Sequence, residues 1–170
     1  MINQSANIKW KNPTLGIVYP HTVTFIHPNS SLTIPKVNFN LSNYSSILKS
    51  LSESTQNSLN VLSVKDIVLP TVIFENGTRT YLNPYGDIWE TGAQYNFTGK
   101  EKYVNSGFIW PEGNVPKGFA NTTAFTVKFE DQGVFNFLCL LHPEMKGNVT
   151  VTPPNTTLFG FNVPYPIKWR

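Results

Sequence analysis

The feature that most constrains the fold is a pair of alternating runs on either side of a short turn. In AFTVKFE and GVFNFLC, residues 124–130 and 133–139, every second side chain is apolar. A period of two is typical of a β-strand that buries one face. The turn Asp131-Gln132-Gly133 predicts a hairpin between the runs, and the second strand would deliver Cys139 to the end of a core strand.

Composition extends this interpretation to the whole chain. Its 170 residues suffice for one domain with a sizeable core and are few for two. The chain is 40% hydrophobic and only 14% charged, with many Asn, Ser, Thr, Pro and Gly residues, which suits short strands joined by turns. We therefore expect an all-β fold and a single domain spanning residues 1–170.

Two further strands are predicted near the ends of the chain. The run IVYPHTVTFIH, residues 17–27, alternates after its proline and places His21 and His27 on the same face. Residues 148–152, NVTVT, form a short last strand that Pro153 ends. The first of these strands therefore carries a histidine near each end.

The long middle of the chain, residues 29–115, has weaker patterns. Apolar residues at helical spacing predict one short amphipathic helix within residues 43–59. VLSVKDIVLPTVIF, residues 61–74, is interpreted as a strand with an edge or a break at its proline, followed by a hairpin turn at residues 75–78. Another strand is expected near residues 93–97.

Charge and targeting features exclude some classes of partner. The net charge of +3 and the pI near 9.0 come from scattered lysines, so no nucleic-acid-binding face is expected. No apolar run reaches the length of about 18 residues that a membrane span needs, and the start, MINQSANIKWK, lacks the pattern of a signal peptide.

Sequons of the form Asn-x-Ser/Thr recur along the chain and favour an extracytoplasmic location, periplasmic or at the cell surface. Any membrane anchor would then belong to a segment not present in this chain. The sequons begin at Asn3, Asn29, Asn40, Asn43, Asn76, Asn96, Asn121, Asn148 and Asn155.

The single cysteine lies on a loop with two other metal-binding residue types. One cysteine excludes an internal disulfide, so the thiol is core filler, a nucleophile or a metal ligand. In Cys139-Leu-Leu-His142-Pro-Glu-Met145 a thiol, an imidazole and a thioether follow one another at steps of three residues. Thiolate and imidazole bind copper strongly, and a thioether adds a weak axial bond. The loop therefore predicts a copper site that includes Cys139, His142 and Met145.

A second imidazole would have to come from His21 or His27. Six residues of extended strand span roughly 20 Å, whereas a metal–nitrogen bond is about 2 Å long, so one strand cannot offer both histidines to one ion. Geometry alone leaves the choice between the two histidines open.

These residues resemble the cupredoxins, the small blue-copper electron carriers such as plastocyanin and amicyanin. The resemblance rests on YPHTVTF around His21 and on GVFNFLCLLHPEMKGNVTV, and it is best over the stretch from Phe125 to Val151. The spacing Cys-x-x-His-x-x-Met is similar to the short amicyanin-like loop. IKWKNPTLG, residues 8–16, is similar to the strand that precedes the first ligand in this family.

The resemblance implies a Greek-key β-sandwich that binds one type 1 copper ion through His21, Cys139, His142 and Met145. It also implies a long insertion within residues 29–115, between the first histidine and the Cys-His-Met loop. The family often has Asn after the first histidine, where the side chain ties the two ligand segments together. Here Thr22 takes that position, which predicts a weaker or different tie.

The function implied is electron transfer, with copper cycling between Cu(I) and Cu(II), rather than enzymatic catalysis. The exposed edge of His142 would be the electron exit, and a redox protein would dock on an apolar patch around it. Leu140, Leu141 and Pro143 flank this histidine, although the two leucines have core packing as an alternative role.

Two other functions are alternatives for the same copper. One is a mononuclear redox protein whose open axial position acts on a small molecule such as nitric oxide. The other is copper delivery or storage, which is disfavoured because two methionines and three histidines are too few for the clusters that this function needs.

Overall fold

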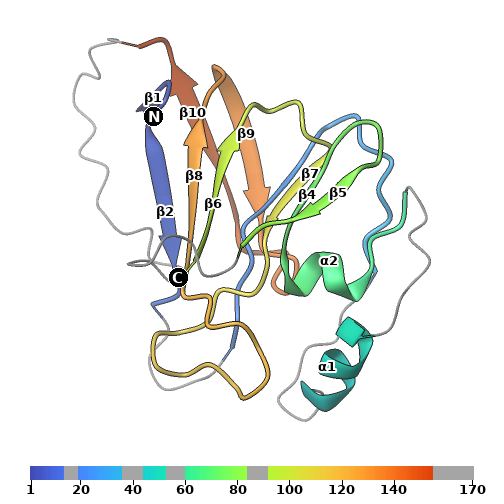
Figure 1. Ribbon diagram of the computed structural model, residues 1–170. Coiled ribbons are helices and arrows are strands. Elements are labelled where there is room, and N and C mark those ends of the chain that lie inside the picture. Colours follow the sequence, from blue (N-terminus) through green and yellow to red (C-terminus); the bar gives the residue numbers. More distant parts are fainter. Residues whose placement is uncertain (14–18, 36–43, 53–59, 84–91, 155–170) are drawn as a thin grey trace.

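A computed structural model gives the fold of the chain (Figure 1). The structure describes residues 1–13, 19–35, 44–52, 60–83 and 92–154. These residues form ten strands and two short helices. In chain order they are β1 (Ile2–Asn3), β2 (Asn7–Lys11), β3 (Thr24–Ile26), α1 (Tyr44–Ser52), α2 (Val64–Val68), β4 (Pro70–Ile73), β5 (Arg79–Tyr81), β6 (Gly92–Phe97), β7 (Tyr103–Ser106), β8 (Ala124–Phe129), β9 (Gly133–Leu138) and β10 (Lys146–Thr152).

The strands form two sheets that share one core. One sheet has seven strands in the order β1-β10-β9-β3-β7-β4-β5, and the other has three in the order β2-β8-β6. Buried side chains of both sheets meet between them, among them Trp10 from the smaller sheet and Phe25 and Phe137 from the larger. The Trp10 ring contacts both phenylalanines edge-on, at centroid distances of 6.0 and 5.6 Å. The expected all-β, two-sheet fold is therefore confirmed.

The predicted hairpin between residues 124–130 and 133–139 is wrong, although both strands form. β8 pairs with β2 and β6 in the smaller sheet, whereas β9 lies between β10 and β3 in the larger one. The intervening turn carries the chain from one sheet to the other. The rings of Phe129 and Phe135 then face each other across the core, with their centroids 5.7 Å apart. An alternating pattern indicates which face of a strand is buried, but not which strand lies beside it.

The strand that carries the first histidine is shorter than expected. The sequence predicted residues 17–27, whose first two residues lie outside the described part, and β3 includes only Thr24–Ile26. Upstream of β3, His21 and Ile109 form an isolated bridge through two backbone hydrogen bonds of 3.1 and 2.8 Å. Pro20 has no N–H and cannot extend this pairing. His21 is thus held by a single bridge at the end of the sheet.

Residues 61–74, expected to be a strand, contain a helix followed by a strand. α2 begins after Ser63, whose side chain accepts a hydrogen bond from the Asp66 N–H at 3.3 Å. In return, the Asp66 carboxylate accepts one from the Ser63 N–H at 2.8 Å. This reciprocal capping box stabilises the first turn of a helix. β4 then begins directly at Pro70, where the sequence predicted an edge or a break, and it pairs with a strand on each side.

The turn, the helix and the strand predicted elsewhere in the middle segment are confirmed where the structure describes them. The turn at residues 75–78 joins β4 to β5 in an antiparallel hairpin, and β6 includes the strand expected at 93–97. α1 forms within the predicted helical segment and contacts α2, while residues 53–59 lie outside the described part. In the view of Figure 1 both helices lie below β4, β5 and β7, with α2 nearer to the sheet.

α2 covers the face of the larger sheet that points away from the core. Neighbouring residues of β7 point to opposite faces. Val104 packs in the core between the sheets, whereas Tyr103 and Asn105 donate hydrogen bonds to the backbone carbonyl of Asp66 in α2. All residues of β4 and β7 are buried as a result. This part of the larger sheet, near its β5 edge, therefore lies between an aromatic core and a helix.

Candidate metal centre

Three side chains from two distant segments converge at one end of the larger sheet. The donor atoms of His21, Cys139 and His142 all lie within 4.8 Å of one another. Sγ of Cys139 lies 3.9 Å from Nδ1 of His21 and 3.6 Å from Nδ1 of His142. The two imidazole rings are tilted at 51° with centroids 4.9 Å apart. This arrangement is a candidate metal site with one sulfur and two nitrogen donors.

Pairing between β3 and β9 brings the two segments together. Thr24 lies opposite Leu138 and Phe25 opposite Phe137, so the residues just before β3 and just after β9 become neighbours. His21 precedes β3, and Cys139 follows β9 directly. The sheet register therefore selects His21, although the two segments are more than a hundred residues apart in sequence.

The loop between β9 and β10 supplies the other donors. The Met145 N–H donates to the His142 carbonyl at 2.8 Å, and the Cys139 N–H donates to the Met145 carbonyl at 2.9 Å. These two bonds close the loop into a compact turn in which Cys139, His142 and Met145 are neighbours. Met145 is half-buried and lies near the three-residue cluster.

The electrostatic environment keeps the first histidine neutral. Burial, together with the neighbouring charge of His142, lowers the pKa of His21 to about 4. At neutral pH its imidazole therefore has a lone pair to donate, as metal ligation requires. The Cys139 side chain is fully buried. The Thr22 N–H donates a hydrogen bond to its Sγ at 3.3 Å.

The Thr22 side chain makes the tie that the sequence analysis expected to be weaker or different. Its hydroxyl accepts a hydrogen bond of 2.8 Å from the N–H of Leu140, directly after the candidate sulfur ligand. Thr22 is fully buried, so no solvent competes for this bond. The tie between the two ligand segments is thus formed by a hydroxyl in place of an amide.

His27 and Glu144 lie outside the cluster. The His27 N–H donates to the Lys102 carbonyl at 3.2 Å, and its Nδ1 accepts from the Asn29 N–H at 3.3 Å. Glu144 is exposed on the loop. Among the residues that the structure describes, no carboxylate belongs to the cluster.

Ile109 and Asn105, which no sequence pattern had singled out, support the site from β7 and the residues after it. Ile109 holds His21 through the backbone bridge, and Asn105 hydrogen-bonds to Thr24 on β3. A signal for the second contact was present in the sequence, because Thr22 and Thr24 place hydroxyls on one face of an otherwise apolar strand.

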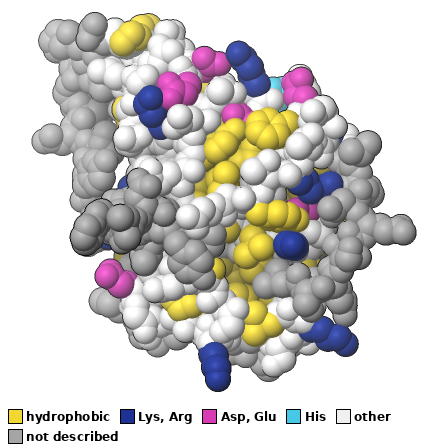
Figure 2. Space-filling view, viewed as in Figure 1, with side chains coloured by type: hydrophobic (Ala, Val, Ile, Leu, Met, Phe, Trp, Pro, Cys, Tyr) yellow, Lys and Arg dark blue, Asp and Glu magenta, His cyan; other side chains and the backbone are white. Residues whose placement is uncertain are grey.

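The surroundings of His142 are partly apolar. Leu140 and Leu141 are half-buried and pack against a cluster that includes Phe108 and Trp110. Figure 2 shows apolar side chains gathered in a band across the face seen in Figure 1, with charged side chains of both signs scattered around them. The two leucines therefore act at least in part as core residues.

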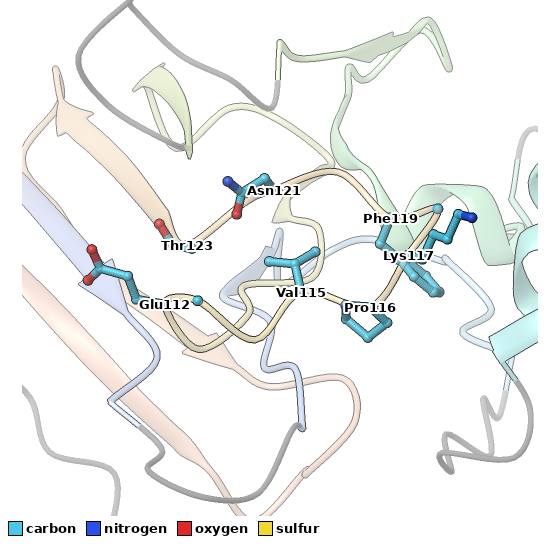
Figure 3. Close-up of a pocket in the computed structure, with 9 residues that line it drawn as sticks. Glu112, Val115, Pro116, Lys117, Phe119, Asn121 and Thr123 are labelled. Atoms are coloured by element: carbon cyan, nitrogen blue, oxygen red, sulfur yellow. The ribbon is translucent and has the colours of Figure 1, made fainter.

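A cleft lies beside this cluster and is separate from the candidate metal centre. It has a volume of about 480 Å³ and is lined by the loop from Glu112 to Thr123. Figure 3 shows Glu112 and Thr123 at one end of the cleft and Lys117 and Phe119 at the other. None of the three clustered donors lines it.

The donor set fits a soft or borderline transition metal. Copper and zinc both accept one thiolate and two imidazoles, and a nearby thioether is characteristic of copper sites.

Comparison with protein-family models, curated proteins and solved structures finds no match to this chain. In the described part of the chain, no helix is both long enough and apolar enough to span a membrane.

Proposed function

We propose that the chain is a type 1 copper protein that transfers electrons. His21, Cys139 and His142 would hold the metal, and the thioether of Met145 would add a weak fourth ligand. The observation that carries this proposal is the position of the Cys139 sulfur, 3.9 and 3.6 Å from the two imidazole nitrogens. A copper ion held there would supply one-electron chemistry between Cu(I) and Cu(II).

The residues around the donors support electron transfer because they resist movement. The β3–β9 pairing holds the two ligand segments in register, and the Thr22 hydroxyl joins them a second time. The closed loop restrains His142 and Met145. Donors held in this way would keep nearly the same positions in both redox states, so little reorganisation would accompany the transfer of an electron.

The proposal includes a redox protein as the partner and an extracytoplasmic location. A redox protein would dock where His142 is partly exposed, with the neighbouring Pro143 and Lys146 exposed at the surface. The sequons support the extracytoplasmic location. Residues 29–115 would contain an insertion within a single domain.

The test is titration of the metal-free protein with Cu(II), followed by visible absorption and electron paramagnetic resonance. We expect an intense thiolate-to-copper band at one equivalent, and a reversible one-electron wave in voltammetry. Cys139→Ser should abolish the band, and His21→Ala should abolish or strongly shift it. His27→Ala is the matched control and should leave it unchanged, because His27 lies outside the cluster.

Two results would contradict the proposal. If folded protein gives no charge-transfer band with stoichiometric copper, the site is not a type 1 site. If Zn²⁺ binds at Cys139 and copper cannot compete with it, the cluster is a zinc site without redox chemistry.

A further inference from the structure

A buried chain of hydrogen bonds runs from the candidate metal centre into β7. The Leu140 N–H donates to the Thr22 hydroxyl at 2.8 Å, and the hydroxyls of Thr22 and Thr24 lie 3.2 Å apart. The Thr24 hydroxyl donates to Oδ1 of Asn105 at 2.9 Å. Thr22, Thr24 and Asn105 are all fully buried.

The same series of hydrogen bonds continues into α2. Nδ2 of Asn105 donates to the backbone carbonyls of Asp66 at 3.0 Å and Ile67 at 2.9 Å. Carbonyl oxygens near the end of so short a helix lack partners within it, so Asn105 satisfies both. These two contacts determine the orientation of the amide, because a carbonyl only accepts and therefore must face the NH₂ group.

The protons of this chain point in one direction. Oδ1 of Asn105 only accepts, so the single proton of the Thr24 hydroxyl is used there. The bond between the two threonines then uses the proton of Thr22. Every donor from Leu140 to Asn105 therefore points away from the metal centre, an arrangement in which neighbouring hydrogen bonds strengthen one another.

We propose that Thr24 and Asn105 are positioning residues for the metal centre. They hold the Thr22 hydroxyl beneath the Leu140 N–H and thereby keep the Thr22 N–H on Sγ of Cys139. Through Asn105 this position depends on α2, which gives part of residues 29–115 a role as a support for the site. The inference rests on the proposed function, because it assigns these residues to the tuning of a bound copper.

The expected effect follows from the bond to sulfur. A hydrogen bond to a thiolate withdraws charge from the sulfur and so favours the reduced metal. Loosening Thr22 should weaken this bond, lower the reduction potential and shift the thiolate-to-copper band. Loss of an outer partner of a metal ligand typically lowers metal affinity about 10- to 100-fold, and we expect about tenfold for Thr24.

The experiment compares two threonines that both lie opposite Asn105. Thr24 is its partner on β3 and Thr71 its partner on β4, and both are fully buried. The Thr71 hydroxyl donates to the Leu69 carbonyl at 2.8 Å and is not part of the chain. Thr24→Val and Thr71→Val therefore remove the same group from the same sheet, and only the first breaks the chain.

Copper affinity, reduction potential and the visible band are measured for both variants. Thr24→Val should show all three changes, Thr24→Ser should restore wild-type values, and Thr71→Val should leave them unchanged. If Thr24→Val does not fold, Thr24→Ala provides the same comparison with a smaller side chain. Equal values for Thr24→Val and Thr71→Val would overturn the inference.

Amide hydrogen exchange in the metal-free protein separates this inference from the proposed function. The Leu140 N–H should exchange about tenfold faster in Thr24→Val than in the wild type or Thr71→Val, since its acceptor is no longer held. If wild-type protein lacks the copper band, the proposed function fails, and the exchange rate still decides whether Thr24 positions Leu140. An unchanged exchange rate would overturn the positioning role directly.

Discussion

The backbone N–H of Leu140 donates a hydrogen bond of 2.8 Å to the hydroxyl of Thr22, a residue 118 positions earlier in the chain. The Thr22 N–H in turn donates to Sγ of Cys139. One threonine therefore contacts the segment after β9 twice, next to the candidate ligand His21. The geometry of the site depends on this pair of contacts as much as on the donors themselves.

Replacing Thr22 by valine should destabilise the metal-free protein by about 1–3 kcal/mol, because the partly buried Leu140 N–H loses its acceptor. Copper affinity should also fall, by about tenfold or more. Thr22→Ser keeps the hydroxyl and should recover most of both losses. Urea unfolding and copper titration measure the two effects, and wild-type stability in Thr22→Val would show that the tie is unimportant.

Met145→Leu should keep the thiolate-to-copper band and raise the reduction potential. The three clustered donors remain, whereas an apolar side chain would replace the weak thioether ligand that Met145 is proposed to provide and that would favour the oxidised metal. Glu144→Gln, on the exposed side of the same loop, should retain the band and the copper affinity. Voltammetry measures the potential, and an unchanged value in Met145→Leu would mean that the thioether does not bind.

Arg79→Met should destabilise the protein by about 3 kcal/mol, because it leaves the buried carboxylate of Asp66 without its cation. Nε of Arg79 lies 3.5 Å from Oδ2 of Asp66, and the two side chains are 7% and 0% exposed. Lys100→Met is the control. It breaks a pair with Asp131 at the same distance, but those side chains are 81% and 44% exposed, so the loss should stay below about 1 kcal/mol.

Denaturant unfolding measures the free energy of unfolding of the two ion-pair variants, with one common dependence on denaturant concentration (m-value) used for both. Equal losses in Arg79→Met and Lys100→Met would mean that the buried pair contributes no more than an exposed one. The neutral donors around Asp66, among them Ser63 and Tyr81, would then be sufficient for its carboxylate.

Gly107→Ala should be strongly destabilising, by about 3 kcal/mol or more. Gly107 has a φ of 65°, and an added Cβ would lie 2.6 to 2.7 Å from backbone atoms of Val68, Leu69 and Pro70. Gly113→Ala has a similar φ of 78° with nothing within 4 Å, so only the backbone strain of about 1–2 kcal/mol applies. Thermal unfolding should therefore give Gly107→Ala a much lower Tm than Gly113→Ala.

The sequence was informative where the pattern is local. The steps of three residues from Cys139 to His142 and Met145 placed these side chains on one loop, and the structure closes that loop with two backbone bonds. The alternation in β8 and β9 predicted both strands and their buried faces. The capping box of Ser63 and Asp66 was also readable locally, but the apolar residues around it were interpreted as a strand.

The sequence by itself determined the all-β class, the loop that carries the sulfur, and the presence of a histidine near each end of one strand. Only the tertiary structure placed β8 and β9 in different sheets, brought His21 rather than His27 to Cys139, and set α2 behind Thr24 and Asn105. The physical reason is that periodicity reports the local backbone and the face it buries. Strand neighbours and buried hydrogen-bond partners depend on contacts between segments a hundred residues apart. The same alternating pattern in a strand is compatible with several different strand orders, so the sequence pattern does not determine these contacts.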